Sequence, residues 1–69
     1  MANTVYKMIE ITGTSPKSID DAVQSAIARA SATVRNMQWF EIVEIRGRVN
    51  QDKVNQWQVT LKIGFTIED

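Results

Sequence analysis

The sequence has no cysteine, no histidine and a single proline. Without cysteine there is no disulfide, and without cysteine or histidine there is no thiolate or imidazole metal site. Cys-His and Ser-His catalysis in their usual forms are excluded by the same absences. Two of the three devices that commonly stabilise a very small domain, disulfides and such metal sites, are therefore missing. For a chain of 69 residues, association with further subunits is the device that remains.

An excess of one charge is also missing, because eight basic and eight acidic residues cancel and are interspersed along the chain. A nucleic-acid partner is disfavoured, since binding to the phosphate backbone depends on clustered lysine and arginine. No apolar run is long enough to span a bilayer, and the N-terminal residues lack the charged and apolar regions of a signal peptide. We therefore expect a soluble cytoplasmic protein without a membrane partner, folded as a single domain over residues 1–69.

The first half of the chain predicts a strand followed by a helix. Residues 5–12 are rich in β-branched and aromatic types, which favours a strand. Residues 13–17 contain glycine and proline and are expected to form a turn. Ser18 is a candidate helix N-cap, and apolar residues then recur at helical spacing from Ile19 to Met37. This helix would bury one face and expose the other.

The second half predicts two strands, over residues 40–49 and 54–67, joined by a turn. The last strand alternates apolar and polar residues along its length, which is the clearest pattern in the chain. Matching the two alternations pairs Val43 with Leu61. A helical crossover makes the first two strands parallel, so the third strand lies between them and antiparallel to both. The expected fold class is α+β, with a three-stranded sheet of order 2-3-1 packed on one helix.

The face of this sheet opposite the helix is expected to be polar. The predicted register pairs Ile45 with Val59 on the helix side, and it pairs Arg46 with Gln58 and Glu44 with Thr60 on this opposite face. Polar strand residues are normally solvated, which is one interpretation of this face. The alternative is a subunit interface or a polar cavity, and the small core favours that alternative.

Six short segments resemble the pattern of the dodecins, in the same order and at the same spacing. They are Val5-Tyr6-Lys7, Gly13-Thr14-Ser15, Trp39-Phe40-Glu41, Arg46-Gly47, Gln58-Val59 and Lys62-Ile63-Gly64-Phe65. The combination is specific, because Trp-Phe-Glu follows an amphipathic helix and precedes Gln-Val and Gly-Phe. The resemblance implies a β-α-β-β protomer that assembles into a hollow homododecamer, with helices outside and sheets facing inward.

Dodecins bind flavins in pairs between tryptophans of different subunits, and they store and protect the flavin without turning it over. The resemblance therefore implies a protein that is not an enzyme and binds FMN, riboflavin or FAD; some members also bind coenzyme A. By the same resemblance, the stacking tryptophan falls on Trp39, the glutamine that hydrogen-bonds the isoalloxazine on Gln58, and the arginine near the flavin on Arg46. Thr66 departs from the pattern, since many bacterial members have an arginine there.

Each of these residues also has an ordinary structural interpretation. A tryptophan between a helix and a strand is usually part of the core, Gln58 could be a solvated strand residue, and Arg46 could pair with Glu44. Trp57 shares the buried parity of its strand and is expected in the core. Two other functions stay open, namely a structural or adaptor homo-oligomer without a flavin and a weak flavin-dependent oxidoreductase.

Overall fold

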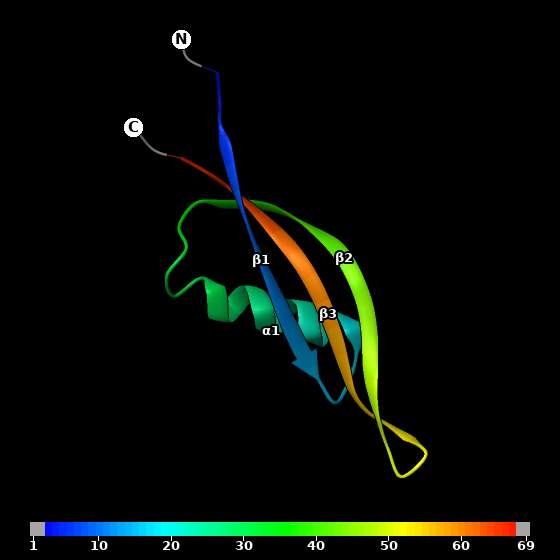
Figure 1. Ribbon diagram of the computed structural model, residues 1–69. Helices are drawn as coiled ribbons and strands as arrows, with labels where there is room; N and C mark the ends of the chain where they lie inside the picture. The colour runs from blue at the N-terminus through cyan, green and yellow to red at the C-terminus, as the bar shows by residue number, and fades with distance from the viewer. Residues whose placement is uncertain (1–2, 68–69) are drawn as a thin grey trace.

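The computed structural model describes residues 3–67, which form one helix and three strands. Along the chain these are β1 (Tyr6–Ser15), α1 (Ile19–Ala30), β2 (Met37–Asn50) and β3 (Lys53–Thr66). The strands form an antiparallel sheet in the order β1-β3-β2, and α1 lies across one face of it (Figure 1). The predicted α+β class, element order and strand order are confirmed.

The junction between β1 and α1 is built from small residues. The helix begins at the predicted N-cap, since the Ser18 hydroxyl accepts a hydrogen bond from the Asp21 amide at 3.0 Å. The strand runs on through Ser15, so Gly13 lies in β1 and the predicted turn over its position is wrong. A Cβ on Gly13 would lie 2.7 Å from the Cβ of Ala26, so the glycine allows close helix packing. Buried Ser15 also donates a hydrogen bond to the Asp21 carboxylate at 2.7 Å.

The helix ends at Ala30, and its predicted extension to Met37 is wrong. The hydroxyl of Ser31 donates a hydrogen bond to a carbonyl in the last turn at 2.6 Å, which competes with the helical pattern. Asn36 then adopts a left-handed φ of 63° and turns the chain into β2. Because β2 starts earlier than predicted, Trp39 lies inside a strand and not at a junction.

The β2–β3 pairing follows the predicted register on one side of a β-bulge. Three predicted pairs are confirmed: Ile45 with Val59, Arg46 with Gln58 and Glu44 with Thr60. Leu61, however, pairs with Ile42 and not with Val43. The reason is a register shift between Ile42 and Glu44, which leaves Val43 as the extra residue. Before Val43 the odd-numbered residues of β2 face away from the helix, and after Val43 the even-numbered residues do.

The core is small and lies under only part of the sheet. Its buried side chains come from α1 and β3: Ala22, Val23, Ala26, Val59, Leu61 and Ile63. The alanines let the helix approach the sheet closely, and α1 packs chiefly on β1 and β3. The apolar side chains of β2 on this side stay exposed, with relative exposures of 47% for Phe40, 42% for Ile42 and 47% for Ile45.

The β2–β3 hairpin gives the chain an elongated shape of 57 × 20 × 13 Å, because it extends past the helix (Figure 1). The turn falls where predicted, with Gln51 and Asp52 at φ values of 52° and 63°. Two successive positive φ angles are typical of a type I′ hairpin turn. Within residues 3–67, no helix is long and apolar enough to cross a membrane.

Candidate ligand-binding face

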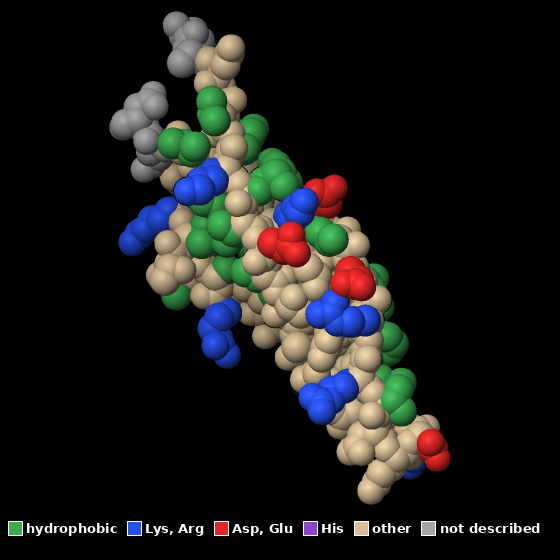
Figure 2. All heavy atoms as spheres, in the orientation of Figure 1, with side chains coloured by type: hydrophobic (Ala, Val, Ile, Leu, Met, Phe, Trp, Pro, Cys, Tyr) green, Lys and Arg blue, Asp and Glu red, His purple; other side chains and the backbone are tan. Residues whose placement is uncertain are grey.

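The side of the sheet turned away from α1 carries most of the charged and amide side chains. Directly paired residues on neighbouring strands point to the same side, so the register identifies the members of this polar face. They include Glu10, Glu41, Glu44, Arg46, Arg48, Gln56, Gln58, Thr60 and Lys62. Figure 2 looks onto this face: acidic and basic side chains alternate down the strands, and apolar side chains gather at the end nearer the termini.

The bulge at Val43 decides on which side Trp39 lies. In an uninterrupted strand Trp39 and Arg46 have opposite parity and would point to opposite faces. The extra residue between them brings both to one face, where Trp39 pairs with Gly64 and Arg46 pairs with Gln58. All three residues assigned to the flavin by resemblance therefore share the polar face.

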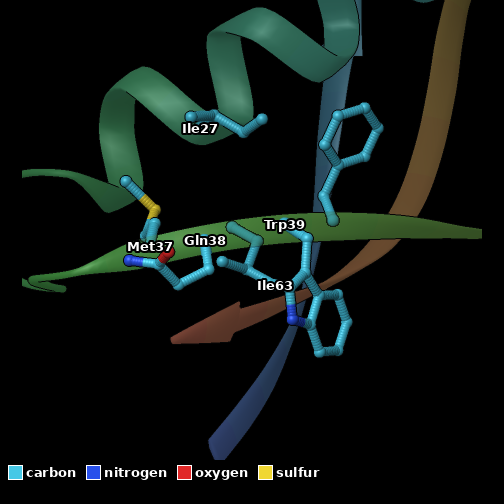
Figure 3. A pocket seen from close by; sticks show the side chains of 6 residues that line it. Ile27, Met37, Gln38, Trp39 and Ile63 are labelled. Carbon is cyan, nitrogen blue, oxygen red and sulfur yellow. The ribbon is translucent and has the colours of Figure 1, made fainter. Parts of the chain in front are cut away.

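The indole of Trp39 lies over the backbone of Gly64 and is 39% exposed. A Cβ on Gly64 would lie 2.7 Å from Cη2 of the ring and closer still to Cε2 and Cζ2. On the same face the Tyr6 ring is tilted by 59° to the indole, with the ring centroids 6.0 Å apart. Figure 3 shows the indole on the opposite side of β2 from Ile27 of α1. The ring is therefore not part of the core beneath the helix.

Gln58 and Arg46 are joined in a chain of polar side chains. Nε of Arg46 donates a hydrogen bond to Oε1 of Gln58 at 2.9 Å, and Nη1 of Arg46 lies 2.6 Å from Oε1 of Glu44. Nε2 of Gln58 donates to Oε1 of Gln56 at 3.0 Å. A carboxamide has two N–H donors and two acceptor lone pairs, so Gln58 retains one of each for a ligand. The Arg46–Glu44 ion pair considered in the sequence analysis is present.

Trp39 and Gln58 do not meet within one chain. The β3 residue beside Trp39 is Gly64, which lies six positions along the strand from Gln58. At ~3.3 Å per residue this separation is roughly 20 Å. A flat aromatic ligand that contacts both side chains therefore takes Trp39 from one chain and Gln58 from another.

Three further side chains lie at the edge of this face, on it and beneath it. Thr66 pairs with Tyr6 at the end of the sheet, and Arg48 pairs with Gln56 on the polar face. Trp57 pairs with Ser15 on the helix side, as its parity predicts, but it is only half-buried and lies outside the core cluster, so the expected core position is wrong. Among residues 3–67, no group of three Asp, Glu, Cys or His side chains is placed to hold a metal ion.

Tyr6 and Gly64 are the members of this face that sequence reasoning missed. Both lie in segments that carry the dodecin resemblance, but neither was assigned a role. Their contact with Trp39 joins three strands from opposite ends of the chain, and no local pattern indicates it. The predicted register, extended past Val43, places Phe65 opposite Trp39, and only the bulge brings Gly64 under the indole.

The family model described as Dodecin matches residues 5–68. The chain belongs to the dodecin family. A curated dodecin from Thermus thermophilus is 45% identical over 65 residues, which is 94% of each chain. The structure of dodecin from Streptomyces coelicolor is 45% identical, with a TM-score of 0.94 over 100% of this chain and 99% of that one. Dodecin from Streptomyces davaonensis is 44% identical, with a TM-score of 0.94 over 99% and 100%.

Proposed function

We propose that this dodecin-family chain is a cytoplasmic, non-enzymatic protein that binds, stores and protects FMN or a related flavin as a homododecamer. The observation that carries the proposal is the indole of Trp39, which lies on the polar face with one side against the sheet and remains partly exposed. Indole is an electron-rich surface and isoalloxazine a flat, electron-poor one. Offset stacking of two such rings contributes ~0.5–1.5 kcal/mol beyond the burial of their area.

The polar side chains near Gln58 fit the other edge of the flavin. The free N–H and lone pair of Gln58 suit the adjacent carbonyl and N–H groups of the isoalloxazine pyrimidine ring. Arg46 holds the amide oxygen of Gln58, and its own charge is paired with the Glu44 carboxylate. A bound flavin would supply a reversible redox centre, and the chain's own residues bind and shield it. Coenzyme A is a second proposed ligand, by family resemblance alone.

Assembly is part of the proposal because one chain leaves its surfaces incomplete. The apolar side chains Phe40, Ile42 and Ile45 are exposed on the helix side of β2. A pocket of about 170 Å³ lies between α1 and β2, lined in part by Ile27 and Ile63 (Figure 3). Contiguous exposed apolar surface of this kind marks an interaction site, and a second copy of the chain is the proposed occupant.

A structural homo-oligomer without a ligand is the second candidate, because the exposed strip on β2 supports assembly whether or not a flavin binds. The two candidates differ in what the Trp39 indole does. An oxidoreductase is disfavoured, since a flavin held between two indoles leaves little room for a substrate beside its reactive atoms.

The test is an FMN titration followed by flavin fluorescence, on protein whose mass has been measured by sedimentation. We expect quenching on binding, because a stacked indole donates an electron to the excited flavin. Trp39→Ala should lose most of the affinity and keep the assembled mass. Trp57→Phe, which alters the tryptophan of the helix side, is the matched control and should quench like the parent protein.

Two results would contradict the proposal. Assembled parent protein that leaves added FMN fully fluorescent would support the structural oligomer instead. Steady oxidation of a reduced nicotinamide by the FMN-loaded assembly, lost in Trp39→Ala, would support the oxidoreductase.

A further inference from the structure

The Trp39 ring rests on Gly64 by its face. The three ring atoms that a Gly64 Cβ would meet most closely are the consecutive carbons Cε2, Cζ2 and Cη2, all within 2.7 Å. A carbon beside the edge of a ring would meet only two ring atoms so closely, so the added Cβ would lie over the ring plane. Every residue other than glycine has a Cβ here, and the indole would have to leave this position.

Tyr6 limits the ring from the side. Its centroid lies 6.0 Å from that of Trp39 with the planes at 59°, which is within the range of tilted aromatic pairs. Tyr6 belongs to β1, whereas Trp39 belongs to β2, so the indole reaches across the central strand to make this contact. Both rings are exposed, 48% for Tyr6 and 39% for Trp39. The pair is therefore not held by a surrounding core.

We propose that Gly64 and Tyr6 are positioning residues that hold the Trp39 indole flat on the sheet before any ligand binds. Gly64 leaves the space in which the indole lies flat on the backbone, and the Tyr6 ring beside it opposes rotation of the Trp39 side chain. This inference rests on the proposed flavin site and deepens it. With one face on Gly64, each indole offers a single face to a flat heteroaromatic ligand, so the second face of a stack comes from another chain.

Preorganisation of this kind raises affinity because the ring does not lose rotamer freedom on binding. Gly64→Ala fills the space that the indole occupies. Its matched control is Gly47→Ala, the same change on β2, where the added Cβ meets the backbone oxygen of Gln56 at 3.0 Å and no aromatic ring. Tyr6→Leu removes the aromatic ring beside the indole, and Tyr6→Phe keeps that ring and removes only the hydroxyl.

Two readouts separate this inference from the flavin proposal. The first is the near-ultraviolet circular dichroism of the flavin-free assembly, which reports how the tryptophans are held. Gly64→Ala and Tyr6→Leu should reduce the indole bands, and Gly47→Ala and Tyr6→Phe should not. The second is the FMN dissociation constant, which should rise about tenfold in Gly64→Ala and severalfold in Tyr6→Leu, on the scale of one lost stacking contact.

A mutant cycle with Trp39→Ala shows whether the effects pass through the indole. In that background Gly64→Ala should no longer change the circular dichroism or the residual FMN affinity, because no ring is left to displace. If Gly64→Ala does not assemble, Tyr6→Leu against Tyr6→Phe decides by the same readouts. Unchanged indole bands and FMN affinity in Tyr6→Leu and in folded Gly64→Ala would overturn the inference and leave the flavin proposal standing. A parent protein that does not bind FMN would contradict the flavin proposal, and the flavin-free spectra would still test the positioning.

Discussion

The carboxamide of Gln58 can serve a ligand only through the atoms that its neighbours leave free. Arg46 occupies one acceptor position and Gln56 receives one N–H, at 2.9 Å and 3.0 Å. These contacts orient the amide, so the remaining N–H and lone pair have defined directions. In the proposed site, the residues around Gln58 would therefore affect flavin binding through the orientation of this amide.

Replacing the Gln58 amide by a carboxylate tests how much its N–H donor contributes to binding. Gln58→Glu keeps the shape and keeps an acceptor for Arg46, but it has no N–H to offer. An unpaired flavin carbonyl costs about 1–3 kcal/mol, so the FMN dissociation constant should rise at least roughly fivefold. Fluorescence titration measures it, and sedimentation checks that the assembly is intact.

The control for this substitution is Gln56→Glu, which adds the same charge two residues away on the same face. Its dissociation constant should stay within about twofold of the parent value, because a carboxylate at this half-buried position still accepts the N–H of Gln58. Equal losses in the two variants would show that charge, and not the missing N–H, weakens binding.

The local sequence pattern predicts most of this fold, but it does not predict the irregularity in β2. The regular alternation of β3 and the N-cap at Ser18 were sufficient to predict the class, the strand order and most of the register. The bulge at Val43 was missed, and it is the feature that puts Trp39 on the polar face. A trace of it is visible in the charges, which change parity between Glu41 and Glu44.

Other features depend on pairing that no short segment encodes. The end of α1 was misplaced because the apolar spacing continues past Ala30, while Ser31 and the left-handed Asn36 set the actual boundary. The contact of Trp39 with Gly64 joins positions 25 residues apart and depends on the strand register. The roles of the candidate site residues come from the resemblance and stay a prediction, whereas the positions of these residues on the sheet required the structure.

The turn of the β2–β3 hairpin is a place where the chain can be made more stable. Gln51 and Asp52 both have positive φ angles, which cost about 1–2 kcal/mol for most residues and less for Asn, Asp or Gly, so most of the strain falls on Gln51. Gln51→Asn combined with Asp52→Gly should therefore raise the free energy of unfolding by about 1 kcal/mol. Urea unfolding at a fixed protein concentration measures it, because assembly makes stability depend on concentration.

Gln51→Glu is the control for the turn, since it keeps an unbranched side chain at the same φ and should change stability by less than about 0.5 kcal/mol. FMN affinity should not change in either protein, because Trp39 lies near the start of β2 and the turn follows its last residue, at the hairpin end seen in Figure 1. An Asn-Gly variant no more stable than the parent would show that the turn is not strained in solution.

The exposed surface of one chain comprises a polar face and an apolar strip, and only the apolar strip gains stability from burial against another subunit. The polar face is solvated without help, whereas Phe40, Ile42 and Ile45 form a strip on the helix side that α1 does not cover. A core of six buried apolar residues is small for an independent domain. Burial of this strip against a second copy would add the apolar area that the chain lacks.

A charge on this strip should separate assembly from ligand chemistry. Ile45 lies opposite Val59 and is 47% exposed, so Ile45→Glu should fold as a chain but bury an unpaired carboxylate in the proposed interface. We expect sedimentation to give a smaller species, and FMN quenching to be lost with it, because the proposed site takes Trp39 and Gln58 from different chains.

Gln24→Glu, on the exposed side of α1, adds the same charge and should assemble and quench normally. An Ile45→Glu protein that keeps the parent mass would place the interface elsewhere. A dissociated chain that still quenches FMN with full affinity would show that a single chain contains the whole site.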